Sequence, residues 1–125
     1  MDTPQISELW LSENGSMAFF RMRRGLDEAP QPLLAHIVRH NLQQMRLLYA
    51  REQPSADQGG APTRCEVYRL GIRTAVVERD RDHLQMLIAS NPQQHRSVRF
   101  HRIEPTSSRA ARELVMFLCK LTQAH

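Results

Sequence analysis

The sequence predicts a small α+β domain with an N-terminal β-hairpin, one long amphipathic helix, one or two further strands and a C-terminal helix. Three observations support this fold class: an Asn-Gly dipeptide between two short apolar stretches, a helical repeat of apolar residues over 33–51, and a second apolar segment near the C-terminus. A mainly α-helical protein is the alternative, if residues 65–90 form continuous helix. The chain has 125 residues, which suits a single domain over 1–125.

The hairpin is predicted by Asn14-Gly15, which separates the apolar stretches 6–12 and 16–22. Asn-Gly favours a type I′ turn because both central residues of that turn have positive φ. Counting outward from a two-residue turn places Trp10 opposite Phe19. The same register pairs Leu9 with Phe20 and Glu8 with Arg21.

The long helix is predicted over 33–51, after Pro30 and Pro32. Apolar residues recur there at spacings of three and four, the repeat of a helix with one buried face. The repeating positions are Leu34, Val38, Leu42, Met45 and Tyr49.

The middle of the chain is less regular. Prolines and Gly59-Gly60 predict a flexible loop at about 53–63. Residues 68–76 alternate between apolar and polar, which favours a strand with a bulge at Gly71, although the same residues also allow a helix. Asp80 or Asp82 is expected to cap a short helix over 83–90, and the alternation over 98–103 predicts another strand.

The last helix begins after Ser107 or Ser108 and runs to about Thr122. Val115, Met116 and Cys119 lie off its main apolar stripe, so its middle turns are apolar almost all the way round. A domain of this size has few elements with which to cover such a helix. We therefore expect a partner to cover it, first of all a second copy of the chain.

Composition excludes several classes of protein. Lys+Arg is 17 against 13 Asp+Glu, a net charge of +4, and Lys120 is the single lysine. Two cysteines cannot form a disulfide framework. The sequence shows no membrane span and no export signal, which predicts a cytoplasmic protein. His36 and His40 are four apart, but no Glu follows the first histidine as it does in metalloproteases, so no metal site is predicted. The sequence has no Gly-x-Ser-x-Gly motif and no phosphate-binding glycine loop, and no cofactor or catalytic residue is predicted.

The sequence therefore favours a non-enzymatic regulatory protein that acts through protein–protein contacts as a homodimer. An inhibitor or anti-activator of a bacterial transcription factor is the first choice, and a small basic nucleic-acid-binding regulator is the alternative, since arginines surround Phe100. The predicted partner surface is an apolar patch with an arginine rim. The patch comprises Leu114, Val115, Met116, Leu118 and Cys119, and the rim comprises Arg39, Arg46, Arg109 and Arg112.

Overall fold

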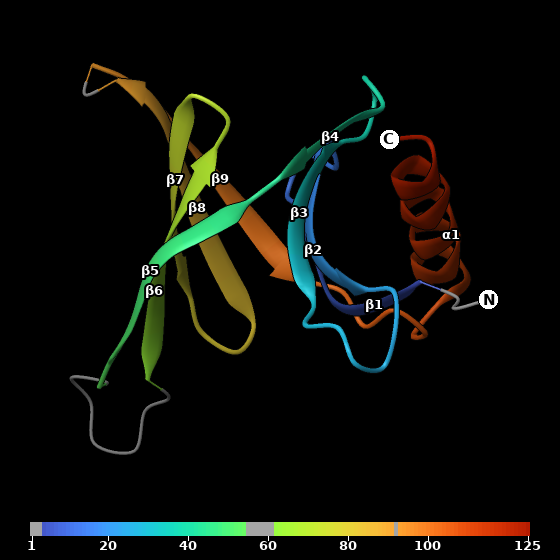
Figure 1. Cartoon of the computed structure of the whole chain (residues 1–125). Coiled ribbons are helices and arrows are strands. Elements are labelled where there is room, and N and C mark those ends of the chain that lie inside the picture. The colour runs from blue at the N-terminus through green and yellow to red at the C-terminus, as the bar shows by residue number, and fades with distance from the viewer. Residues whose placement is uncertain (1–3, 55–61, 92) are drawn as a thin grey trace.

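The structure is a computed structural model that describes residues 4–54, 62–91 and 93–125. These residues form one curled sheet of nine antiparallel strands, followed by one helix (Figure 1). The predicted α+β domain with a long helix is therefore wrong, and so is the mainly α-helical alternative. The strands are β1 (Gln5–Ser12), β2 (Met17–Arg23), β3 (Gln31–His36), β4 (Asn41–Gln44), β5 (Arg46–Gln53), β6 (Thr63–Leu70), β7 (Arg73–Arg79), β8 (His83–Asn91) and β9 (Gln94–Arg102), and the helix is α1 (Arg109–Gln123).

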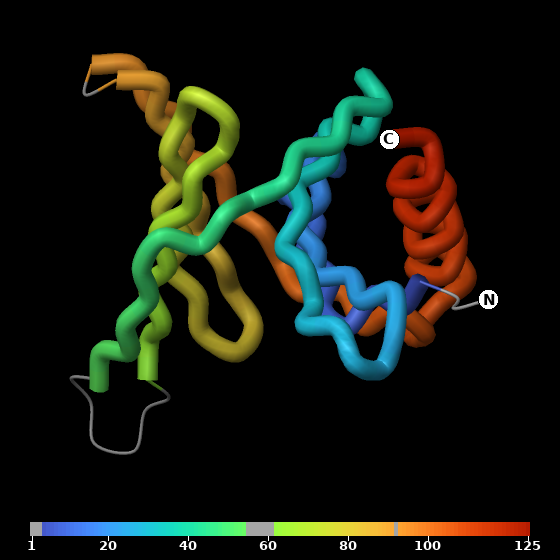
Figure 2. Tube along the Cα trace, viewed as in Figure 1, coloured from blue at the N-terminus to red at the C-terminus, as the bar shows by residue number. Residues whose placement is uncertain are grey.

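The sheet curls until its two edge strands meet at Met45. The strand order is β4-β3-β2-β1-β9-β8-β7-β6-β5, so β4 and β5 lie at opposite edges. Yet only Met45 separates them along the chain, and its N–H donates to the carbonyl of Pro32 at 3.0 Å. One stretch of chain therefore pairs with β3 at its start and with β6 at its end, which gives a half-barrel (Figure 2).

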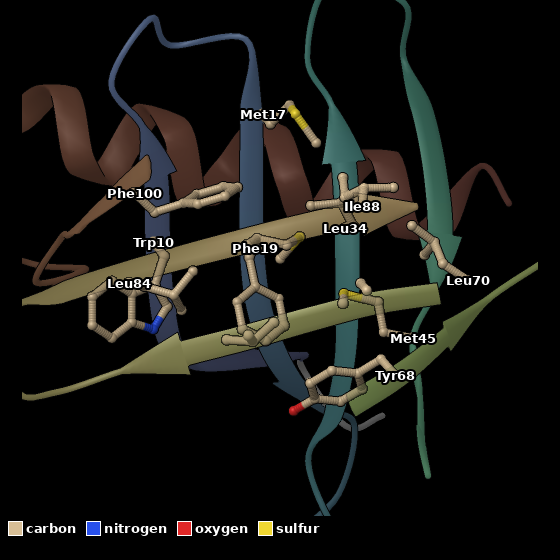
Figure 3. Packing of buried hydrophobic residues seen from close by; sticks show 13 residues of the cluster. Trp10, Met17, Phe19, Leu34, Met45, Tyr68, Leu70, Leu84, Ile88 and Phe100 are labelled. Atoms are coloured by element: carbon tan, nitrogen blue, oxygen red, sulfur yellow. The ribbon is translucent and has the colours of Figure 1, made fainter. Parts of the chain in front are cut away.

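Two apolar layers hold the half-barrel and the helix together. The inner layer lies between the β1–β4 half and the β5–β9 half of the sheet and includes Trp10, Phe19 and Tyr68 (Figure 3). The rings of Phe19 and Tyr68 meet edge to face, with centroids 6.0 Å apart. The outer layer lies between the β1–β4 half and α1, where Leu118 and Leu121 pack against the sheet. α1 thus covers one half of the sheet and leaves the other uncovered (Figure 1).

The N-terminal hairpin is confirmed, with its register. Trp10 pairs with Phe19, Leu9 with Phe20 and Glu8 with Arg21.

The predicted type I′ turn of this hairpin is wrong. Gly15 has φ 74°, but His40 is the single non-glycine residue with positive φ in the described part of the chain. The N–H of Gly15 donates to the Ser12 carbonyl at 2.9 Å, which closes the turn one residue earlier than a type I′ turn would. Asn14 contributes through its side chain, whose Oδ1 accepts from the Ser16 N–H at 3.0 Å.

The predicted helix over 33–51 is wrong because β3, β4 and β5 occupy this stretch. Leu34 faces the inner layer, whereas Leu33 and Ala35 face the layer under α1. A strand that is buried on both faces has no apolar–polar alternation, so its pattern resembles that of a helix.

Some of the remaining secondary-structure predictions are confirmed and others are wrong. The predicted strand over 68–76 is two strands, because Gly71, with φ 64°, lies in the turn between β6 and β7 and not in a bulge.

The predicted helix over 83–90 is β8. Asp80 does accept the N–H groups of Asp82 and His83 at 2.9 Å, but this cap closes a β-turn. The strand over 98–103 is confirmed as part of β9.

Most of the predicted loop at 53–63 lies outside the described residues, and Gln53 and Thr63 pair on either side of the gap.

The C-terminal helix is confirmed together with its cap. The Ser108 hydroxyl accepts the Ala111 N–H at 3.0 Å, and α1 ends at Gln123, one residue beyond the prediction. In the described residues no helix is both long and apolar enough to cross a membrane.

Candidate functional site

The functional groups lie at the two ends of the half-barrel, where the rows of inward-facing residues change from apolar to charged. Side chains alternate between the two faces of a strand, so residues two apart share a face. At one end, His36 continues the inward row of Leu34, Arg73 that of Ala75, and Arg96 that of Val98. The β1–β2, β3–β4, β6–β7 and β8–β9 connections all lie at this end because every pairing is antiparallel.

The opposite end is charged but balanced. Glu66 of β6 is 1% exposed, and its Oε2 lies 3.1 Å from Nη2 of Arg21 and 3.3 Å from Nε of Arg64. Its Oε1 lies 3.1 Å from Nε of Arg79, which also pairs with Glu8.

Two further contacts complete this cluster. Nη2 of Arg21 donates to the Tyr68 hydroxyl at 2.7 Å, and the indole N–H of Trp10 donates to Glu8. Burial, ahead of the neighbouring charges, raises the pKa of Tyr68 to about 12, so its hydroxyl stays protonated. The cluster therefore joins β1, β2, β6 and β7 at the base of the inner layer.

A cavity beside this cluster is also balanced. Its volume is about 320 Å³. Both signs of charge line it, with Glu13, Glu78 and Asp80 against Arg79 and Arg99. Such a lining has no strong preference for an anion or a cation.

The end with His36 carries an excess of positive charge. Two adjoining cavities of about 310 and 370 Å³ share His36, Arg73 and Arg96. We call these two cavities together the cationic cleft. Neither is lined by Asp or Glu among the described residues. The first cavity is completed by Ser16, Val38, Arg39 and Asn41, and the second by Met17, Ile88, Ser90, Gln93, Gln94 and His95.

Burial and the arginines of the cationic cleft affect the ionisation of His36. Burial, followed by the charges of Arg73, Arg39 and Arg96, lowers the pKa of its imidazole below the ordinary 6.5, so His36 is neutral at pH 7. Within the described chain, no carboxylate lies within salt-bridge distance of these three arginines. Arg73 is oriented by Gln43, whose Oε1 accepts from Nη2 at 3.2 Å.

The β3–β4 loop that carries Arg39 is held from two sides. The Ile37 N–H donates to the Ser16 carbonyl at 2.9 Å, which ties the loop to the β1–β2 turn. His40, in the left-handed region at φ 52°, packs its ring edge to face on Phe117 of α1, with centroids 5.3 Å apart. Arg39 is thus presented by an anchored loop.

The predicted apolar patch lies on α1, but its members differ in exposure. Leu118 is fully buried in the outer layer and is not part of the surface. Leu114, Val115 and Cys119 are half-buried, and Met116 is 59% exposed. Burial raises the pKa of the Cys119 thiol, which keeps it protonated.

The four predicted rim arginines lie in three different places. Arg109 pairs with Glu113 at 3.1 Å, and Nη1 of Arg112 donates to the Thr106 carbonyl at 3.4 Å, both near the start of α1. Arg46 lies on β5 opposite Arg69, and Arg39 lines the cationic cleft.

Sequence reasoning did not group His36, Arg73 and Arg96. The alternation in Arg73-x-Ala75-x-Val77 and Arg96-x-Val98-x-Phe100 carries a usable signal, because each arginine continues an inward apolar row. That signal requires the turn at Gly71 to be recognised first.

Comparison of the chain with protein-family models, with curated proteins and with solved structures finds no match. In the described residues, no group of three or more His, Cys, Asp or Glu is arranged to hold a metal ion. What the fold and the site define is a half-barrel protein with one balanced and one cationic end.

Proposed function

We propose that this protein is a non-enzymatic regulatory protein that binds an anionic ligand in the cationic cleft. The observation that carries the proposal is the lining of the cleft, where Arg39, Arg73 and Arg96 lie with a neutral His36 and no carboxylate from the described residues. We retain the cytoplasm as the proposed compartment, supported by two free cysteines.

Charge repulsion explains why an anion suits this cleft. Three guanidinium groups that face one cavity repel one another, and an anion between them would relieve this repulsion. Arginine pairs with phosphate or carboxylate through two parallel hydrogen bonds, which gives affinity and a defined orientation. A phosphate or carboxylate group is therefore the expected ligand.

A binding role is supported by the kinds of groups that line the cleft. They are mainly hydrogen-bond donors, and neither Asp, Glu nor Cys lines it among the described residues. In the part of the chain that the structure describes, no carboxylate lines the cleft with His36 to orient its imidazole as a general base.

The proposal is tested by titrating the protein with inorganic phosphate at low salt and following backbone and arginine side-chain NMR signals. We expect saturable shifts at residues of the cationic cleft. Losing two charge-assisted contacts in the double variant R73Q/R96Q should weaken binding by about tenfold or more. R99Q is the matched control, because Arg99 lies on β9 too but lines the cavity at the balanced end. If no saturable shift appears in the cleft, or if R99Q and R73Q/R96Q weaken binding equally, the proposal is wrong.

A second candidate function is the binding of another protein on the outer side of α1. The observation that favours it is the exposure of Met116 beside the half-buried Val115 and Cys119. A second copy of this chain is the first occupant to test, and a transcription factor is the next.

A further inference from the structure

We infer that the anion bound in the cationic cleft is the phosphate of a free nucleotide, whose base occupies the larger of the two cavities. This inference rests on the proposed function, because it names the ligand of the same site. It follows from the unequal chemistry of the two cavities on either side of their shared residues.

The shared residues mark the place of the phosphate. His36, Arg73 and Arg96 line both cavities, and the smaller cavity adds Arg39, Ser16 and Asn41. A phosphate in the smaller cavity, beside this junction, would face all three guanidinium groups. A free inorganic anion would need only this part of the cleft, so the larger cavity requires a separate explanation.

The larger cavity, of about 370 Å³, combines an apolar floor with a polar rim. Met17 and Ile88 are 1% and 7% exposed and belong to the inner layer, where they lie toward the same end of the cluster (Figure 3). Polarisable methionine and flat guanidinium groups both pack well against aromatic rings.

The rim of this cavity supplies groups that could recognise the edge of a base. Ser90, Gln93, Gln94 and His95 come from the end of β8, the following turn and the start of β9. Hydroxyl, amide and imidazole groups both donate and accept hydrogen bonds, as the edges of nucleobases require. A cavity with an apolar floor and a few polar groups is typical of sites for small organic ligands of this size.

The test compares AMP, GMP, CMP and UMP with inorganic phosphate and with adenosine by calorimetry under one buffer condition. We expect the preferred nucleotide to bind about tenfold or more tightly than phosphate, because contacts of the base in the larger cavity add to those of the phosphate. Adenosine alone should bind weakly.

Two variants separate the base from the phosphate. S90W places a bulky ring at the larger cavity and should abolish the preference for nucleotide over phosphate. S97W is the matched control, since Ser97 is exposed on the neighbouring strand β9, one residue out of phase with Arg96 and Val98, and should keep the wild-type preference.

Each outcome decides one of the two proposals. If phosphate and the four nucleotides bind equally well, the nucleotide inference is wrong and the anion-binding function stands. If none of them binds, the anion-binding function itself is wrong. If single-stranded oligonucleotides bind far more tightly than mononucleotides, with affinity that grows with length, the ligand is nucleic acid and the free-nucleotide inference is overturned.

Discussion

At the scale of single residues, Glu66 is the central negative charge at the balanced end of the half-barrel. It is the most buried of the charged groups there, and it pairs with three arginines, two of which also pair with Glu8 and one with Glu52. Removing one member of a buried ion-pair network leaves the other charges uncompensated, which costs about 3–5 kcal/mol.

We therefore expect E66A to lower the free energy of unfolding by about 3–5 kcal/mol, measured by urea denaturation. The control is E104A, since Glu104 is exposed and forms only a surface pair with Arg102 at 3.6 Å. Its effect should stay within about 1 kcal/mol. Equal effects of the two substitutions would show that the Glu66 network contributes no more than a surface pair.

His36 provides the pH dependence of the cationic cleft. Its pKa is lowered by burial and by Arg73, Arg39 and Arg96, so protonation in the empty cleft is unfavourable. A bound anion would offset this repulsion and favour the imidazolium. The affinity for sulfate, whose charge is constant over this range, should therefore increase as the pH falls below 6.5 through the pKa of His36.

The stability of the folded chain depends on pH in the opposite direction to the sulfate affinity. A histidine whose pKa is lowered by folding takes up a proton more readily in the unfolded chain, so without anion its contribution to stability decreases as the pH falls below 6.5. H36Q should weaken both dependences, as followed by sulfate titration and by denaturation at several pH values. A wild-type sulfate affinity that does not change with pH would contradict this role of His36.

Single residues also show what the sequence could reveal about the site. Counting from Asn14-Gly15 correctly paired Glu8 with Arg21, because a hairpin register depends only on local spacing. Glu66 and Arg79 join that pair only because the sheet curls, and no local rule reports this. The same holds for Arg73 and Arg96, which meet His36 only in the folded half-barrel.

At the scale of elements, α1 was predictable and β3 to β5 were not. Ser108 and the apolar repeat define α1 through contacts within a few residues of each other. The stretch 33–51 is rich in Leu and Arg, which favour helices, and only pairing with β2 and β6 makes it strand. Tertiary contacts therefore overrode the intrinsic preference.

Met116 gives α1 an apolar side chain on its exposed side. If a second copy covers Met116, wild-type protein should associate in sedimentation experiments as its concentration rises, and M116E should stay monomeric. The substitution should change stability by no more than about 0.5 kcal/mol, because Met116 is 59% exposed within one chain.

The matched control is K120E, which also adds negative charge to an exposed position of α1. A wild-type chain that stays monomeric at all concentrations would exclude the dimer. Association that K120E and M116E reduce to the same extent would indicate a general charge effect and not a contact at Met116.

At the scale of the whole molecule, the cationic cleft lies where the two halves of the curled sheet face each other. His36 and Arg39 come from the β1–β4 half, whereas Arg73 and Arg96 come from the β5–β9 half. These halves are joined by the β1–β9 pairing on one side and by Met45 on the other. Because the like charges of the two halves repel each other across the empty cleft, an anion bound between them should stabilise the folded molecule as a unit.

A ligand that binds only the folded chain raises the free energy of unfolding by about 2.7 kcal/mol at one hundred times its dissociation constant. We therefore expect saturating phosphate to raise the melting temperature of wild type and R99Q equally, and that of R73Q/R96Q far less at the same concentration. Without anion, the double variant should differ from wild type by no more than about 1 kcal/mol, because its substitutions remove repulsion between arginines and cost the one hydrogen bond from Arg73 to Gln43. Calorimetric melting with and without phosphate measures both effects, and sodium chloride at matched ionic strength separates specific binding from screening. A rise in melting temperature that is equal in all three proteins would place the anion elsewhere on this arginine-rich surface.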